Sequence, residues 1–495
     1  MKSFKVCYVS SEITPFAKTS IANGLAATSS ALPTALKEME QDIRLMMPKY
    51  KSINDRKYVL REVIRLREVN IQLGDATRVG NGKTAFLPNS KVHVYFLSVP
   101  ELFDRKGFYV DPQSGEPYED NAERFGFFCK SVLETLKLLY WQPDIIHCAD
   151  WSTALIPFYL KTLYKDDEFF ENTRTVLTVH NLSQQGVFDK KIAKTIGIDS
   201  EHVKSGAALE LEGKLNFLKG GLLFSDIINL TSSSLTTNLL ANGDPAFGMA
   251  EVLKKRKKDI FGIASGADYA TWNPLEDKLL TAQFDAKTLA KRLENKSTLA
   301  TELRLNDDSK IPLVGVMLNF QIADDVRLVQ ETLPGLLKDD VQAVVLNTGE
   351  FRSITELKDL QKQFPGKLAL RERMDKRIAH LLLGSADITF IPSEISAGEQ
   401  FHLNSMRYGA IPVVQHSGSL ADTIHQFSIE NGKGNGFCFD SPTAEIALEA
   451  IQNALQIRDS AKAWARVQRN AMKTDFSWET TAKDYLKLYE KAQKK

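Results

Sequence analysis

The chain has 495 residues, of which 43% are hydrophobic and 25% are charged, and its formal net charge is +1. This length predicts two or three globular domains, and so balanced a charge argues against nucleic acid or an anionic membrane surface as the main partner. The chain has no run near the ~18 apolar residues of a membrane span, and its first residues lack the apolar core of a signal peptide, so we expect a cytoplasmic protein without a membrane partner.

The first half of the chain alternates short apolar runs with amphipathic stretches. An apolar run at 4–9 predicts a strand buried on both faces, and a helical pattern follows at 25–40, slightly disturbed by Pro33. Further strands are predicted at 42–48, 92–99, 144–148, 175–181 and 226–230, with a long helix at 121–141. Strands that alternate with helices indicate βαβ units and therefore a parallel sheet.

A second series of strands follows a charged stretch at 274–308, which we expect to be rich in helix. The strands are predicted at 311–318, 341–348, 387–392, 411–415 and 436–440. Two such series predict an α/β protein with two Rossmann-like, doubly wound domains, 1–262 and 263–475, that face a ligand cleft. An amphipathic helix is predicted in the last segment, 476–495, with Ser477 as its N-cap.

Candidate site residues lie where predicted strands end, which is where parallel sheets form their sites. Lys18 stands in the loop after the first strand as a lone cation suited to phosphate, although that loop has neither G-x-G-x-x-G nor G-K-[ST]. Asp150 follows the strand at 144–148, and His180 and Asn181 end the strand at 175–181. His180 is a candidate functional residue, with a satisfied structural histidine as the alternative. His147, inside an apolar run, is interpreted as structural.

Other features of the sequence favour no special chemistry. The four cysteines have no C-x-x-C spacing, so neither a zinc site nor a dithiol pair is predicted, and G-x-S-x-G is absent, so a serine hydrolase is poorly supported. The basic run at 254–259 is interpreted as a solvated helix face, with attraction of phosphate as the alternative. Gly432, Gly434 and Gly436 predict a turn before a strand.

Eight strings, in order along nearly the whole chain, resemble the bacterial glycogen synthase and plant starch synthase family. They are VSSEITPFAKT (9–19), ALPTALKEMEQDIRLMMPKY (31–50), DIIHCADWSTALIP (144–157), TVLTVHNLSQQGVF (175–188), NFLKGGLLFSDIINLTS (216–232), FGIASGADYATWNP (261–274), SMRYGAIPVV (405–414) and GSLADTI (418–424). The resemblance implies a glycosyltransferase B-type fold whose C-terminal helix crosses back to the first domain. It also implies a hexosyltransferase that moves glucose from ADP-glucose or UDP-glucose to the non-reducing end of an α-1,4-glucan, with retention. The implied partners are a nucleotide sugar and a glucan, without a metal or another cofactor.

The resemblance also implies roles for single residues. Lys18 matches a lysine near the donor diphosphate, and Gly24 is the glycine kept in that loop where the family has Gly-Gly. His180 matches a histidine that lines the sugar site and Asp150 an aspartate that orders it, so these two are the expected catalytic residues. Asn181 keeps the frame of the same motif and is expected to bind substrate.

Several positions in the second predicted domain depart from the family. Asn319 and Asp324 stand where an arginine and a lysine neutralise the leaving diphosphate. Ser396 stands where a glutamate lies near the transferred sugar, although Glu394 and Glu399 remain close to it in the sequence. Gly418, an expected substrate contact, is kept in a stretch that reads QHSGS instead of Arg-Arg-Thr-Gly-Gly.

Three interpretations of this pattern stay open. The first is an active glucan synthase that uses ADP-glucose. The second is an impaired or inactive homologue that binds glucan or acts as a scaffold. The third is a glycosyltransferase with a different donor, suggested by the altered loop at 20–23. The sequence does not predict the oligomeric state.

Overall fold

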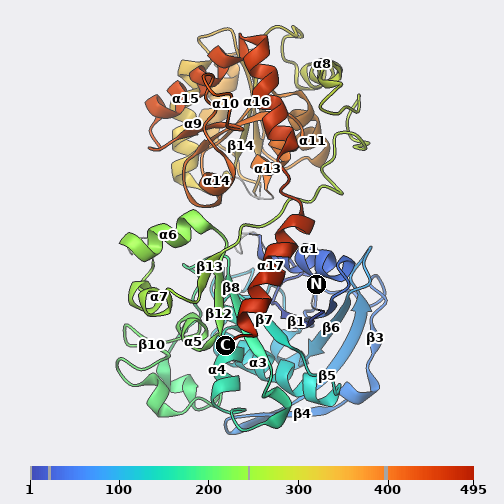
Figure 1. The fold of residues 1–495 in the computed structure, drawn as a ribbon, viewed down its shortest axis with the longest axis vertical. Helices are drawn as coiled ribbons and strands as arrows, with labels where there is room; N and C mark the ends of the chain where they lie inside the picture. The colour runs from blue at the N-terminus through green and yellow to red at the C-terminus, as the bar shows by residue number, and fades with distance from the viewer. Residues whose placement is uncertain (1–2, 20–23, 243–245, 350, 395–399) are drawn as a thin grey trace. The chain divides into compact units, whose positions relative to one another are not determined.

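The computed structural model describes residues 3–19, 24–242, 246–349, 351–394 and 400–495 (Figure 1). The chain divides into two compact units, the first made of Met1–Ile263 with Thr481–Lys495 and the second of Ala264–Thr480. Each unit holds a sheet of mostly parallel strands with helices between them in sequence. The predicted α/β class with two doubly wound sheets is therefore confirmed.

The sheet of the first unit has the strand order β13-β12-β8-β7-β1-β2-β6-β5-β3, with β4 paired to β5. Its parallel strands are β1 (Lys5–Val9), β2 (Asp42–Pro48), β6 (His93–Ser98), β7 (Ile145–Ala149), β8 (Arg174–Val179), β12 (Ile227–Leu230) and β13 (Ile260–Gly262). The chain winds from β1 to one side through β2 and β6, and then to the other side through β7 and β8. The order thus reverses between β1 and β7, which is where ligands of such sheets bind.

Besides the edge strand β13, two groups of strands in the first unit were not predicted. One extends the main sheet in antiparallel fashion, with β3 (Arg61–Glu62), β4 (Val69–Leu73) and β5 (Ala76–Phe86). The other is a small sheet made of β9 (Val187–Phe188), β10 (Glu210–Leu211) and β11 (Lys214–Asn216). The residues of β5 alternate between buried or half-buried and exposed positions, so this strand shows no continuous apolar run, and the small sheet has strands of only two or three residues.

The helices of the first unit are α1 (Leu25–Glu38), α2 (Pro100–Phe103), α3 (Asn121–Leu138), α4 (Leu155–Lys161), α5 (Phe217–Phe224), α6 (Ser233–Asn242) and α7 (Ala250–Arg256). The chain ends in α17 (Trp478–Ala492), whose predicted N-cap, Ser477, accepts a hydrogen bond from the Thr480 amide at 3.3 Å. Within the first unit, Tyr489 of α17 meets Nδ1 of His147 on β7 at 2.8 Å. Of the described helices, none combines the length and the apolar character that crossing a membrane requires.

The second unit has a wholly parallel sheet of order β16-β15-β14-β17-β18-β19, which reverses between β14 and β17. Its strands are β14 (Leu313–Leu318), β15 (Gln342–Asn347), β16 (Leu368–Arg371), β17 (Ile388–Ile391), β18 (Ile411–Gln415) and β19 (Phe437–Phe439). Its helices are α8 (Arg292–Leu303), α9 (Ala323–Leu336), α10 (Thr355–Gln363), α11 (Lys376–Ser385), α13 (Phe401–Arg407), α14 (Gly418–Thr423), α15 (Ala444–Arg458) and α16 (Ala461–Lys473).

The expectation of a helix-rich stretch at 274–308 is wrong for its first half. Residues 274–288 form turns, and helix begins only with a 3-10 turn at Leu289–Lys291 and then α8. Asp285 explains part of this difference, because its carboxylate accepts the amides of Lys287 at 2.9 Å and Thr288 at 3.0 Å. Aspartate that bonds nearby amides in this way favours turns over helix interiors.

An aspartate immediately before a strand aligns neighbouring strands at three places in the two sheets. Each carboxylate accepts a backbone amide at the start of the adjacent parallel strand: Asp144 from Lys5 at 2.7 Å, Asp226 from Thr175 at 2.7 Å, and Asp387 from Leu313 at 2.9 Å. Amides at strand starts otherwise need water or another acceptor. The D-I-I and D-I-T patterns of the sequence therefore mark amino ends of strands as well as their cores.

Candidate functional site

The expected catalytic residues, Asp150 and His180, lie side by side at the carboxyl ends of β7 and β8. These strands pair in parallel, so the residues that follow them emerge at the same edge. The Asp150 amide donates to the Thr178 carbonyl at 2.9 Å, which holds Asp150 to the neighbouring strand. Asp150 has a φ of 60° and a ψ of −175°, a conformation that glycine adopts far more easily than aspartate. Such backbone strain is typical of functional positions.

The carboxylate of Asp150 fixes both the backbone and the ring of His180. One oxygen accepts the His180 amide at 2.7 Å, and the other lies 3.2 Å from the ring nitrogen Nδ1. A carboxylate oxygen accepts hydrogen bonds, so the proton of this bond lies on Nδ1, and Nε2 is the acceptor in the tautomer that this bond selects. The His180 side chain is only 1% exposed, and Nε2 has no hydrogen-bond partner within the described part of the chain.

Aromatic rings pack around Trp151, the residue that follows Asp150. Trp151 follows Asp150 and meets Phe125 with ring centroids 4.9 Å apart and Phe188 at 5.9 Å. Gly186 lies against the indole with a φ of 63°, and a Cβ at this position would stand 2.3 Å from a carbon of the Trp151 ring. The G of the TVHNLSQQG string is therefore required by both backbone conformation and space.

The loop after His180 is held by polar contacts, one of which the sequence analysis missed. Asn181 accepts from Ser183 through both its amide, at 2.9 Å, and its hydroxyl, at 2.7 Å, so it shapes the turn. Gln185 is buried and accepts from the Asn216 side chain at 2.7 Å. A buried pair of amides at this point could not be inferred from sequence, because Asn216 lies far along the chain.

Glu12 is a second residue that the sequence analysis missed. It follows β1 at the reversal point of the sheet, is 0% exposed, and accepts hydrogen bonds from Thr19 and Tyr109. Burial raises the pKa of Glu12 above its ordinary value, even though these hydrogen bonds act in the opposite direction. The signal was present in the VSSE string, where a carboxylate comes three residues after the end of a buried strand.

Lys18 and Gly24 lie on either side of residues 20–23, which are outside the described residues. Lys18 is exposed. Gly24 has a φ of 87° and immediately precedes α1, and a Cβ built on it would meet no atom within 4 Å. The altered loop at 20–23, which suggests the different donor of the third interpretation, lies outside the described residues.

His147 is a structural residue in the structure, as interpreted from its apolar surroundings. Its two ring nitrogens bond Tyr489 at 2.8 Å and Thr178 at 2.7 Å, and it is fully buried. Burial lowers the pKa of His147 to about 3, with a further contribution from nearby His180. It stays neutral at physiological pH and joins β7, β8 and α17.

Asn319 and Asp324, which differ from the residues expected from the family resemblance, follow the carboxyl end of β14 in the second unit. Asn319 accepts the Gln321 amide at 3.0 Å through its side chain and thereby shapes the turn into α9. Asp324 is 86% exposed and pairs with Arg327 at 3.0 Å, one turn along the same helix. These two residues bring no cation to this edge of the sheet.

Gly418 begins α14 with a φ of 51°, directly against Glu394. A Cβ at Gly418 would stand 2.1 Å from a carboxylate oxygen of Glu394, and the other oxygen accepts the Ser419 amide at 3.2 Å. Burial raises the pKa of Glu394. Ser396 and Glu399 fall outside the described residues, so Glu394 is the described carboxylate of this loop.

The basic run at 254–259 is partly structural. Arg256 donates to carbonyls of Leu222 and Ser225, each at 2.6 Å, and pairs with Asp259 at 3.1 Å. It joins α7 to the end of α5. This contact accounts for Arg256 without a phosphate ligand. The four lysines of the run are exposed: Lys254, Lys255, Lys257 and Lys258.

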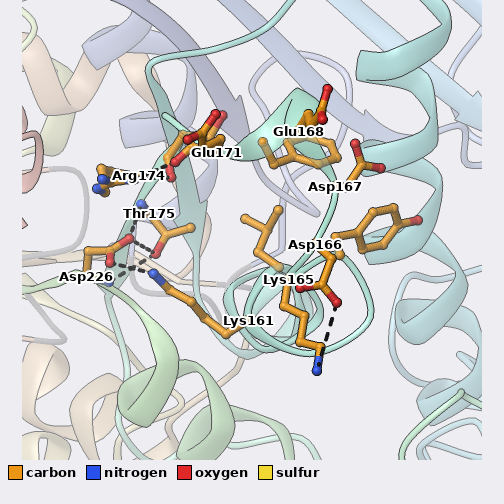
Figure 2. Close-up of a pocket in the computed structure, with 13 residues that line it drawn as sticks. Lys161, Lys165, Asp166, Asp167, Glu168, Glu171, Arg174, Thr175 and Asp226 are labelled. Carbon is orange, nitrogen blue, oxygen red and sulfur yellow. Dashed lines mark hydrogen bonds and ion pairs between the residues drawn. The ribbon is translucent and has the colours of Figure 1, made fainter.

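A pocket of about 360 Å³ opens at the opposite ends of the strands (Figure 2). It lies near the amino ends of β8 and β12, and one carboxylate of its lining, Asp226, pairs with Lys161 at 3.0 Å and accepts the Thr175 hydroxyl at 2.9 Å. Ligands of doubly wound sheets bind at carboxyl ends, and these charges already satisfy each other. We therefore assign the pocket no part in the site.

Among the described residues, three side chains bring potential metal ligands within 4.8 Å of one another: Asp199, Glu201 and His202. They sit on or beside the 3-10 helix Ser200–Val203, and the two carboxylates are exposed. Exposed acidic groups of this kind are common without a metal, and none of the three residues was singled out by the sequence.

Known proteins share this architecture over the length of the chain. Residues 5–255 match the family described as the starch synthase catalytic domain. The chain is 35% identical over 488 residues to the glycogen synthase of Chlorobium phaeobacteroides, covering 99% of this chain and 98% of that one. It is 36% identical over 489 residues to the glycogen synthase of Chlorobaculum parvum, with coverage of 99% and 98%.

Two solved structures are similar in fold to this chain over nearly its whole length. The catalytic domain of starch synthase IV from Arabidopsis thaliana, bound to ADP and acarbose, has a TM-score of 0.85 with 25% identity and covers 100% of both chains. Sucrose-phosphate synthase from Thermosynechococcus elongatus has a TM-score of 0.56 with 14% identity and covers 98% of both chains. The second similarity concerns the fold alone.

Proposed function

Since this chain belongs to the glycogen and starch synthase family and is a glucosyltransferase by that membership, we propose that it extends an α-1,4-glucan from ADP-glucose, with retention. The comparisons confirm the family resemblance drawn from the eight strings. ADP-glucose is preferred to UDP-glucose in the proposal because the similar Arabidopsis enzyme was solved with ADP bound. Neither a metal nor an organic cofactor is part of the proposal.

The observation that supports the proposal most directly is the free acceptor on His180. Its Nε2 atom is buried and has no partner in the described structure, while Asp150 holds the ring from the other side. A buried acceptor without a partner is costly unless a ligand satisfies it. A sugar hydroxyl is such a ligand, and a hydrogen bond from this hydroxyl to Nε2 would orient the glucosyl ring.

Lys18, Gly24, Asn181 and Gly418 have supporting roles in the proposal. Lys18 is the cation for the donor diphosphate, and Gly24 leaves space for a phosphate to approach the backbone. Asn181 shapes the turn after His180. Gly418 would contact substrate through its backbone, since a side chain there would collide with Glu394.

In the proposed reaction, the bond from the anomeric carbon to the diphosphate oxygen breaks. A bond from the same carbon to the 4-hydroxyl oxygen of the glucan end forms on the same face, and the hydroxyl proton goes to the leaving diphosphate. His180, held by Asp150, binds the sugar while charge builds on the diphosphate. A preorganised contact of this kind typically contributes ~3 kcal/mol, or roughly 100-fold in rate.

The test is transfer of labelled glucose from ADP-glucose and from UDP-glucose to glycogen, with wild type, His180→Ala and His202→Ala. His202 is a matched control, because it lies in the same unit with its ring packed against Phe158 at 5.0 Å. Transfer that is lost with His180→Ala and kept with His202→Ala supports the proposal. A wild-type protein that transfers from neither donor would refute the active synthase.

A second candidate, a glucan-binding homologue without transferase activity, is favoured by the second unit. Asn319 and Asp324 offer no positive charge there, and Glu394 adds a carboxylate. Calorimetry with maltooligosaccharides and with ADP distinguishes the candidates. Binding of the oligosaccharide without ADP supports the second candidate, and binding of both supports the first.

We also propose a cytoplasmic location. Its support is that all four cysteines are free, with Cys7, Cys129 and Cys148 buried. Unpaired cysteines are typical of a reducing compartment.

A further inference from the structure

Glu12 receives hydrogen bonds from two directions. From the loop that carries Lys18, the amide of Thr19 donates to Oε2 and the hydroxyl of Thr19 donates to Oε1 at 2.8 Å. From the other side, the Tyr109 hydroxyl donates to Oε1 at 2.8 Å. Glu12 is wholly buried, so water does not compete for these hydrogen bonds.

The contacts continue from Tyr109 to the residues beside the Asp150–His180 pair. Tyr109 lies 2.7 Å from the Ser11 hydroxyl, and Ser152 donates to Ser11 at 2.7 Å. Tyr109 has one hydroxyl proton, which it gives to Glu12, so Ser11 must donate to Tyr109 and Ser152 to Ser11. All the hydroxyl protons in this chain therefore point towards the carboxylate.

We propose that Glu12 is a positioning residue that fixes the Lys18–Thr19 segment relative to the Asp150–His180 pair. The inference rests on the proposed function, because Lys18 has its role there as the cation for the donor diphosphate. Glu12 itself need not touch the substrate. It acts by holding both hydrogen-bonding groups of Thr19, the residue next to Lys18.

A carboxylate is needed for this arrangement because its two oxygens serve three donors. Glutamine has a single acceptor oxygen, and its amide nitrogen would face either the Thr19 amide or one of the hydroxyls. Glu12→Gln is therefore nearly equal in size but cannot satisfy all three donors. Electrostatic proximity to Asp150 also acts on Glu12, since the Asp150 charge contributes to its raised pKa.

The experiment uses two independent measurements on the full chain. The first is hydrogen exchange at the Thr19 amide, by mass spectrometry with fragmentation to single residues. The second is the Kd for ADP by calorimetry. Glu210→Gln is the matched control, because Glu210 also accepts two backbone amides in the first unit, those of Gly206 and Gly213 at 2.6 Å.

For Glu12→Gln we expect exchange at the Thr19 amide to be at least ~10-fold faster and the Kd for ADP to rise on the order of tenfold. Thr19→Val, which removes only the hydroxyl, should raise the Kd by a few-fold, which keeps the idea testable if Glu12→Gln does not fold. Glu210→Gln should change neither quantity. A double variant with Lys18→Ala should lose little more ADP affinity than Lys18→Ala alone, because Glu12 acts through Lys18.

Unchanged exchange at Thr19 in Glu12→Gln overturns the inference, whatever the protein binds. Faster exchange with an unchanged Kd for ADP also overturns it, because Glu12 would then serve structure alone. If wild type does not bind ADP, the proposed function fails separately. Exchange at Thr19 then decides by itself whether Glu12 holds the segment.

Discussion

Asp150→Asn tests whether the tautomer of His180 matters for function. The carbonyl oxygen of the new asparagine can still accept the His180 amide, which Asp150 now accepts at 2.7 Å. Its NH₂ group must then face Nδ1, 3.2 Å away in the present structure. Since NH₂ only donates, the ring would move its proton to Nε2, which changes from an acceptor into a donor.

The expected change in activity follows from which hydrogen bonds Asp150→Asn keeps and which one it loses. Both contacts of residue 150 persist, and asparagine meets the same backbone strain as aspartate at φ 60° and ψ −175°, so the free energy of unfolding should change by less than about 1 kcal/mol. The hydrogen bond from a buried sugar hydroxyl to Nε2 is lost, at a cost of about 2–3 kcal/mol. Transfer measured as kcat/KM with labelled ADP-glucose should therefore fall roughly 30- to 150-fold.

The assay needs the tautomer and the rate on the same sample. ¹⁵N NMR of histidine-labelled protein reports which ring nitrogen carries the proton. Asp144→Asn is the control, because Asp144 accepts a backbone amide at the other end of β7, also at 2.7 Å. If NMR shows the changed tautomer in Asp150→Asn while kcat/KM stays within twofold of wild type, the acceptor role of Nε2 is refuted.

Three further variants test separate parts of the structure. Asp387→Asn should destabilise the protein by about 3 kcal/mol in urea unfolding, because it leaves Lys296 and Arg458 without their buried partner. Desolvation alone would raise the pKa of Asp387, but these cations lower this pKa overall. The contribution of Asp387 to the free energy of unfolding is therefore full at pH values above the ordinary aspartate pKa of about 4, and it is lost as the pH falls further. Gly186→Ala should lower the melting temperature more than Gly213→Ala, since both glycines have positive φ but only Gly186 faces the Trp151 ring; equal shifts would show that the clash is absent. Asn319→Arg with Asp324→Lys should lower the Kd for ADP at least tenfold by calorimetry, and no gain would remove these positions from the donor site.

The fold could be predicted well where strands are buried on both faces. The runs at 4–9 and 144–148 became β1 and β7 within one or two residues, because a strand inside a parallel sheet must be apolar throughout. β5 could not be found this way, since most of its residues are small or polar and its apolar Val79 and Phe86 are exposed. The prediction of helix at 274–288 was wrong for a different reason. The many charged residues there are typical of a solvated helix, but the carboxylate of Asp285 accepts nearby amides and closes turns.

Only the site residues that follow the ends of predicted strands could be found from the sequence. Asp150 and His180 end neighbouring strands, so parallel pairing alone brings them together. Tyr109 and Asn216 enter the site from loops and helix ends far along the chain, and no periodic pattern records which buried acceptor they meet. Glu12 could have been recognised, because a carboxylate after a buried strand at the reversal point needs partners or a ligand.

The charges of the second unit determine how the two proposed functions can be separated. Two unit charges 4 Å apart interact by about 1 kcal/mol in water, and Asp324 is 86% exposed, so this value applies to a phosphate approaching it. Replacing a lysine by this aspartate changes the interaction by about 2 kcal/mol, or roughly 30-fold in affinity. The loss of an arginine at Asn319 adds a further factor of about 5–10 for one charge. Where these two positions face the donor phosphate, as the family resemblance implies, the combined loss is about 150- to 300-fold, and donor binding is weakened without touching Asp150 or His180. An active enzyme should therefore show transfer that rises linearly with ADP-glucose into the millimolar range, whereas a glucan-binding homologue shows none at any donor concentration.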